Sequence, residues 1–124
     1  MYTKPLVNLV ATVFESLGFV THHPMQLLTH PLADSLLSYV LTRPDEKSEN
    51  IGVIVRDWKR IVGVGQIHKA EELLKVCPEL NQVLIISSMG FSHRARHIAK
   101  KKRQISLISK RELISIMVKK LEIS

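Results

Sequence analysis

Two short runs that consist mainly of branched aliphatic residues constrain the fold of this chain more than any other feature. One run is Ile51–Arg56, and the other is Val83–Ser87. A strand with one solvent-facing side alternates apolar and polar residues, whereas a strand covered on both faces is continuously apolar. Both runs therefore predict strands buried between helices, which indicates an α/β layer structure with some parallel pairing.

Segments with helical periodicity surround these runs. The first predicted helix has proline at its first position and Gly18 as its stop, and the last begins with a capping box, Ser-Lys-Arg-Glu at 109–112. The inner face of that last helix would carry Leu113, Ile116, Met117 and Leu121. The four predicted helices cover about residues 5–17, 65–76, 92–103 and the segment from 109 onward.

Three further segments are predicted as strands: 19–23, 35–42 and 105–108. The polar stretch from Arg43 to Asn50 separates the second of these from Ile51–Arg56 and is typical of a hairpin loop. Because that loop is short, strands 35–42 and 51–56 should pair antiparallel. The predicted order is therefore one helix, then three strands, and then helices that alternate with strands.

Composition favours one globular domain over residues 1–124, since 45% of the residues are hydrophobic. No apolar run is long enough for a membrane span, and the segment from Leu6 to Phe19 lacks the features of a signal peptide, so we expect a cytoplasmic protein without membrane contact. The single cysteine, Cys77, cannot form an internal disulfide and has no histidine partners at zinc-site spacing.

The formal net charge is +7, which favours an anionic partner such as nucleic acid. Basic residues cluster at Arg94, Arg96 and 100–103, beside a narrow apolar stripe of the helix predicted there. They could neutralise several phosphates, or they could form a solvated helix face. Charge alone does not separate these two interpretations.

A pair of acidic residues could carry chemistry. Asp34 opens the strand predicted over 35–42, and Asp57 and Lys59 close the next strand, two positions apart and hence on one face. Two carboxylates can hold Mg²⁺, and a neighbouring lysine can offset charge that develops on a phosphoryl group. The alternative is that Asp34 is a turn residue and that Asp57 and Lys59 are ordinary surface charges.

Other polar and aromatic residues near these positions have plainer interpretations. Trp58 should pack between sheet and helix. Gln66 could lie near the site, although we favour an exposed position at the start of its helix. His93 and His97 share a helix face but have no third metal ligand in the sequence pattern, so phosphate contact or plain surface is the better interpretation.

The segment from Val83 to Lys100 resembles the Mrr-type restriction endonuclease domain. It has the apolar strand, two serines, Gly-Phe-Ser at 90–92 and a helix with spaced alanines. Upstream, 53–60 is similar to the family strand that ends in (Glu/Gln)-x-Lys-Arg, and Ala33-Asp34-Ser35 is similar to the strand that opens with a metal-binding aspartate. Asp57 departs from the family preference for Glu or Gln.

The resemblance covers nearly the whole chain and implies a restriction-endonuclease-like three-layer α/β fold with a mixed central sheet. It also implies a metal-dependent DNA endonuclease in which Asp34 and Asp57 bind Mg²⁺ or Mn²⁺ and Lys59 is the catalytic cation. The DNA-binding residues would be Arg60, Arg94, Lys100, Lys101, Lys102 and Arg103.

Two other functions remain open at this stage. One is a degenerate nuclease-fold domain that binds DNA or serves as a subunit of a larger complex, and the other is a purely structural interaction protein. No separate recognition domain is expected in this sequence. Any DNA specificity would then come from DNA shape, a partner protein or a homodimer.

Overall fold

A computed structural model describes residues 5–45 and 49–123 of the chain, with a five-stranded sheet at its centre. The strands are β1 (Val20–His22), β2 (Tyr39–Thr42), β3 (Asn50–Arg56), β4 (Gln82–Ser87) and β5 (Ile105–Ser109). The helices are α1 (Pro5–Ser16), α2 (Pro24–Leu27), α3 (Pro31–Leu36), α4 (Val64–Val76), α5 (His93–Lys100) and α6 (Lys110–Ile123). None of the described helices is long and apolar enough to cross a membrane.

The sheet is mixed, and its strand order follows the chain from β1 to β5. β1, β2 and β3 pair antiparallel, which confirms the predicted hairpin, whereas β3, β4 and β5 pair in parallel. The three parallel strands therefore end at one edge of the sheet, which we call the carboxyl edge, at Arg56, Ser87 and Ser109.

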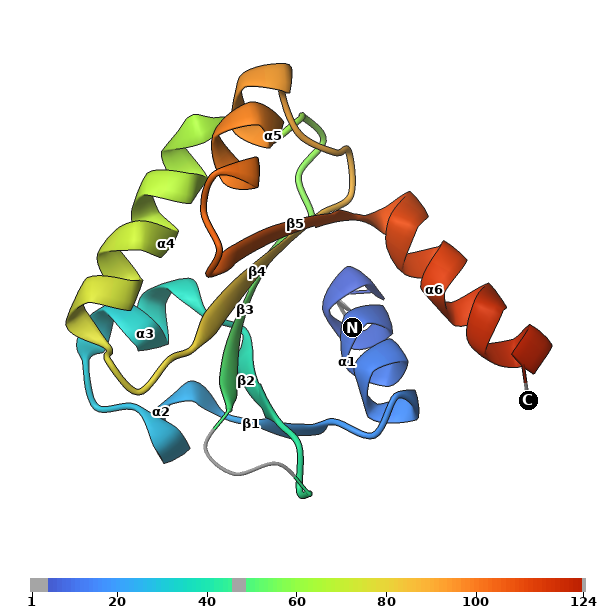
Figure 1. Ribbon diagram of the computed structural model, residues 1–124, viewed down its shortest axis with the longest axis horizontal. Coiled ribbons are helices and arrows are strands. Elements are labelled where there is room, and N and C mark those ends of the chain that lie inside the picture. Colours follow the sequence, from blue (N-terminus) through green and yellow to red (C-terminus); the bar gives the residue numbers. More distant parts are fainter. Residues whose placement is uncertain (1–4, 46–48, 124) are drawn as a thin grey trace.

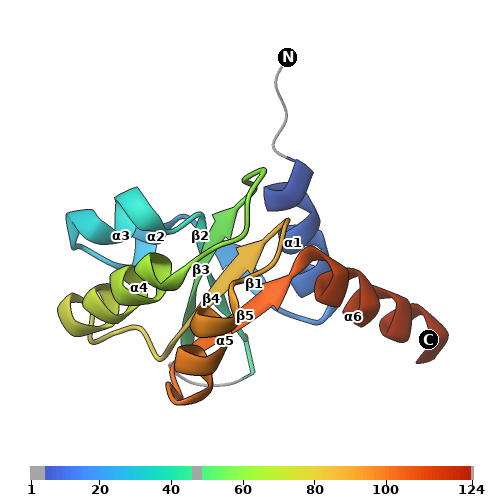
Figure 2. The same cartoon turned by 90° about the horizontal axis from the view of Figure 1, so that it is seen from above.

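Two apolar cores lie on opposite faces of this sheet, and together they make a three-layer fold (Figure 1). Residues of α3, α4 and α5 pack on one face, and residues of α1 and α6 pack on the other. The central strands contribute to both cores: Ile54 and Ile85 face the α4 side, and Val53 and Ile86 face the α1 side. Seen from above, α6 extends away from the sheet towards the C terminus (Figure 2).

Most predicted elements are confirmed by the structure, including α1, α4, α6 and the two aliphatic strands. The helix that follows Ser92 is shorter than predicted, because it ends at Lys100 rather than near Arg103. Part of the predicted hairpin loop, residues 46–48, lies outside the described residues, as does the side chain of Leu121.

The strand predicted over 35–42 is wrong in its first half. Residues Pro31–Leu36 form α3, and only Tyr39–Thr42 form β2, so Asp34 lies in a helix instead of opening a strand. The physical reason is local: Pro31 occupies the first turn, and the imidazole of His30 accepts a hydrogen bond from the backbone N–H of Leu32. The short helix α2 begins in the same way at His23 and was likewise not predicted.

Gly52 allows α3 to approach the sheet closely. A Cβ at this position would lie 2.9 Å from Leu37 Cδ2 and 3.4 Å from Leu80 Cδ2. Leu37 follows α3 directly, and it packs over β3 with Leu80 in the core on the α4 side. The absence of a side chain in the first half of β3 thus lets Leu37, just after α3, pack directly on the strand.

A reciprocal capping box begins α6. Ser109 Oγ accepts the backbone N–H of Glu112 at 3.2 Å, and Glu112 Oε1 accepts the N–H of Ser109 at 3.2 Å. This confirms the start of the last helix as the sequence predicts it.

We predict that Ser109→Ala lowers the free energy of unfolding by about 1 kcal/mol, because an orphan N–H at the helix start loses its acceptor. Urea denaturation followed by circular dichroism measures the change. Ser115→Ala, at an exposed position of the same helix, is the matched control and should be neutral or slightly stabilising. Equal stability of the Ser109 variant and the native chain would contradict a stabilising role of the cap.

Candidate nucleic-acid interface

The loops at the carboxyl edge are joined by hydrogen bonds. After β3, the backbone carbonyl of Arg56 accepts the N–H of Ser88 at 3.2 Å, and the carbonyl of Trp58 accepts the Ser88 hydroxyl at 2.8 Å. Val62 and Phe91 form a parallel β-bridge, and Ser92 N–H donates to the carbonyl of Val62 at 3.0 Å. The loop after β3 and the loop after β4 therefore form one connected surface.

Arg56 is the last residue of β3, and its guanidinium is held by two neighbouring side chains. Its Nε donates to Gln66 Oε1 at 2.8 Å, and its guanidinium lies 5.2 Å from the centre of the Trp58 ring. Burial lowers the pKa of Arg56 from its ordinary value, because partial desolvation disfavours the charged form. This arginine was not among the residues singled out from the sequence. Strand alternation could have indicated it, because Arg56 lies two positions after Ile54 and therefore faces the same, α4 side of the sheet.

Gln66, in the first turn of α4, is only 8% exposed. The expectation of an exposed helix-start residue is therefore wrong, and its amide is turned inward by the hydrogen bond with Arg56.

Trp58 is half-buried against the core on the α4 side, which confirms its predicted packing role. It also lies beneath Arg60, whose guanidinium carbon is 4.6 Å from the ring centre.

The predicted catalytic residues do not follow the expected strand geometry. β3 ends at Arg56, so Asp57 and Lys59 lie in the loop beyond it, and strand alternation does not place them on one face. Both are exposed. Asp57 lines a cavity of about 300 Å³ together with Arg56, Ser35 and Ser38.

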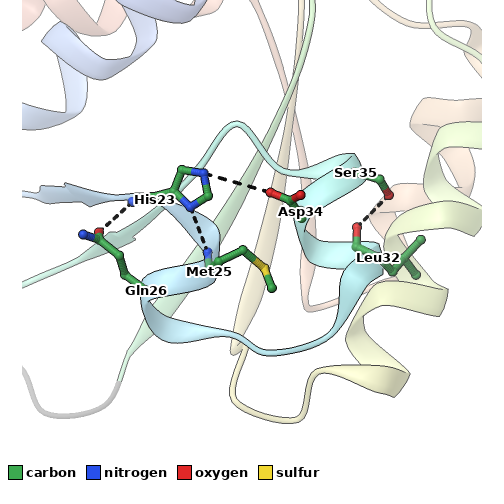
Figure 3. A network of polar contacts seen from close by, with 6 residues as sticks. All are labelled: His23, Met25, Gln26, Leu32, Asp34 and Ser35. Carbon is green, nitrogen blue, oxygen red and sulfur yellow. Dashed lines mark hydrogen bonds and ion pairs between the residues drawn. The ribbon is translucent and has the colours of Figure 1, made fainter.

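Asp34 is exposed on α3, and its side chain points towards His23 (Figure 3). Its Oδ1 lies 4.0 Å from His23 Nε2, while Nδ1 of the same imidazole accepts the N–H of Met25. Of the described residues, Ser35 next to Asp34 lines the cavity of Asp57, and Asp34 itself does not. The roles of Asp34, Asp57 and Lys59 in catalysis and metal binding remain predictions.

The predicted DNA-binding residues divide between two edges of the sheet. α5 runs from the end of β4 to the start of β5, so Arg94 lies near the carboxyl edge and residues 100–103 lie near the opposite edge. There Lys102 forms an ion pair with Glu71 at 2.8 Å, and this hydrogen bond lowers the pKa of the Glu71 carboxyl. Lys100, Lys101 and Arg103 are exposed.

The sequence matches the family model Mrr_cat, restriction endonuclease, over residues 1–117. This chain belongs to the Mrr-type restriction endonuclease family. Domains of this restriction endonuclease type generally use divalent metals. No curated protein sequence matches the chain.

Two solved structures share the fold. A protein of unknown function, AF1548, superimposes with a TM-score of 0.70 at 15% identity, over 94% of this chain and 65% of that one. The DNA modification-dependent restriction endonuclease AspBHI superimposes with a TM-score of 0.60 at 10% identity, over 94% of this chain and 36% of that one. The chain thus spans less than two thirds of either neighbour, and at these identities the likeness concerns the fold alone.

The end of β3 offers a divalent cation one carboxylate, that of Asp57, rather than the two that the sequence predicts. β3 itself ends in Ile54, Val55 and Arg56, and Asp57-Trp58-Lys59, which the sequence comparison matched to the family's (Glu/Gln)-x-Lys, follows in the loop. Ile54 is fully buried in the apolar core, and Arg56 brings a positive charge. Among the side chains that the structure describes, no three of His, Cys, Asp and Glu gather into a metal-binding group. Mg²⁺ prefers oxygen ligands, and among the residues that line the cavity beside this strand end, Asp57 alone carries a carboxylate.

We predict that Trp58→Ala lowers the free energy of unfolding by roughly 2 kcal/mol, less than for a fully buried tryptophan, because the half-buried ring leaves a partly solvated gap. Circular dichroism in urea is the appropriate measurement, since Trp58 is the only tryptophan and the variant loses its fluorescence signal. Trp58→Phe is the control and should recover much of the loss. A variant as stable as the native chain would show that the ring is not part of the packed structure.

Proposed function

We propose that this domain binds DNA with the basic residues of the carboxyl edge and of α5, and that it does not hydrolyse the DNA. The observation that carries the proposal is the end of β3, where the strand closes on the buried Ile54 and on Arg56, whose guanidinium is held by Gln66. An arginine held by a buried glutamine favours an anionic group over a cation.

The charge distribution supports DNA as that anion. The net charge of +7 comes with exposed cations at both ends of α5 and in the loop after β3. α5 has eight residues and is therefore about 12 Å long, so its two ends could contact separate phosphates of one backbone. Affinity would then be largely electrostatic and independent of sequence.

A second candidate is the metal-dependent endonuclease that hydrolyses phosphodiester bonds. Family membership favours it, as does the order Asp57-Trp58-Lys59, which keeps an acidic residue two positions before a lysine. In that function Asp57 and Asp34 would hold Mg²⁺ or Mn²⁺, which activates water and polarises the phosphoryl group, and Lys59 would offset developing charge.

One test of this function concerns the far end of α5. In the double variant Lys100→Gln with Lys101→Gln, the plot of log K against log salt concentration should become less steep. The magnitude of its negative slope should fall by up to about 1.8, because each lost phosphate contact removes about 0.9. Fluorescence anisotropy with labelled duplex DNA at several salt concentrations measures the slope. Lys69→Gln with Lys119→Gln carries the same charge change at exposed positions on other helices and should alter the slope less. Equal slopes for the two double variants would assign Lys100 and Lys101 to solvated surface.

Another test separates DNA binding from DNA cleavage. Duplex, single-stranded and branched DNA are incubated with the protein and Mg²⁺, Mn²⁺ or a chelator, and both retention and products are followed on gels. We expect retention without products in every condition. Asp57→Asn should bind as tightly as the native chain or more tightly, because it removes a negative charge near phosphate.

Metal-dependent products that both Asp57→Asn and Lys59→Ala abolish would instead establish the endonuclease. Neither retention nor products at physiological salt would favour a purely structural role for the domain.

A further inference from the structure

Arg56 is a half-buried charge whose neighbours do not neutralise it. Among the described residues, no carboxylate lies within 4.0 Å of its guanidinium. The ion pairs found in the described part of the chain involve other cationic residues, namely Arg96, Lys102 and His23. A charge removed from water costs free energy unless a partner compensates for it. Gln66 and Trp58 supply a dipole and an aromatic face, but neither supplies a negative charge.

The guanidinium is held in place before any ligand binds. Its Nε donates to Gln66 Oε1 at 2.8 Å, and one N–H of Nη1 makes a long contact of 3.4 Å with the carbonyl of Val55. A guanidinium has five N–H groups, so three remain for a ligand. Because Gln66 is buried in the first turn of α4, the arginine is positioned by the core, and little side-chain entropy would be lost on binding.

A cavity of about 300 Å³ adjoins this arginine. Ser35 and Ser38 line it on the side of α3 and β2, and Asp57 and Trp58 line it beyond β3. Ser35 Oγ donates to the carbonyl of Leu32, and the backbone N–H of Ser38 donates to the carbonyl of Val53. Asp57 opposes an anion here, whereas the exposed cations Lys59 and Arg60 follow it directly in the loop.

We infer that this cavity binds one phosphate of the DNA backbone, with Arg56 as the contacting residue and Gln66 as its positioning residue. A planar guanidinium can pair with two phosphate oxygens at once, which a lysine cannot do. The inference rests on the proposed function and deepens it, since it names the site at which the backbone is held.

Two variants test the inference from different directions. Arg56→Gln removes the charge, and Gln66→Glu keeps the arginine but gives it an internal carboxylate partner. Both should weaken duplex binding about tenfold or more, because hydrogen bonds to charged groups are among the stronger contacts. Both should also reduce the magnitude of the slope of log K against log salt concentration by about 0.9, the value for one phosphate contact. Thermal unfolding of each variant is measured alongside, and Gln66→Glu is not expected to unfold the domain because its new carboxylate faces a guanidinium.

Arg43→Gln is the matched control. Arg43 is also a half-buried arginine stacked on an aromatic ring, with its guanidinium carbon 4.4 Å from the centre of Phe19, but it follows β2 at the other end of the sheet. Arg43→Gln makes the same charge change as Arg56→Gln, and it should affect the DNA affinity and its salt dependence much less.

The outcomes separate the two proposals. If Arg56→Gln and Gln66→Glu bind with native affinity and slope while the Lys100 and Lys101 variant is weakened, DNA binding stands and the phosphate cavity is overturned. If the two variants only lose thermal stability, Arg56 is a structural residue and the inference again fails. If the native chain does not bind DNA, the proposed function itself fails.

Discussion

The burial of β3 and β4 between two helix layers is the constraint on which the rest of the structure depends. Ile54 and Ile85 are fully buried on the α4 side, and Val53 and Ile86 are fully buried on the other. Burying one such side chain contributes about 1.5–3 kcal/mol, so these strands account for a large part of the driving force for folding. They leave no room for polar chemistry within the sheet, and polar side chains can emerge only where the strands end.

The carboxyl edge is therefore where the fold can present a site, and its character there is cationic. The pairing of β3 with β4 brings Arg56 and Ser88 together, and the hydrogen bonds of Ser88 connect the two loops. Trp58 lies under Arg56 and Arg60, so guanidinium groups cover a ring that would otherwise be more exposed. This arrangement presents an anchored positive charge rather than paired carboxylates, and the proposed phosphate contact rests on that difference.

Several features of the fold and of this edge could be predicted from local sequence alone. The aliphatic runs at 51–56 and 83–87 predicted buried strands, the short polar loop predicted their antiparallel neighbour, and Ser92 and Ser109 predicted two helix starts. These signals depend on neighbouring residues only. The segment 24–36 was harder, because His30 and Pro31 begin a helix through a side-chain acceptor that is not a common cap. A run of Leu, Tyr and Val after it favoured one long strand.

The sequence by itself determined the layer class, the order of the main elements and the family to which the chain belongs, since each of these follows from periodicity and motifs along the chain. Only the tertiary structure decided which charges meet. The end of β3 at Arg56 moved Asp57 and Lys59 into a loop, and the packing of α4 brought Gln66 onto Arg56 across ten positions. Asp34 was turned towards His23 by two short helices. Such pairings depend on where strands stop and how helices pack on the sheet, and no spacing in the sequence encodes them.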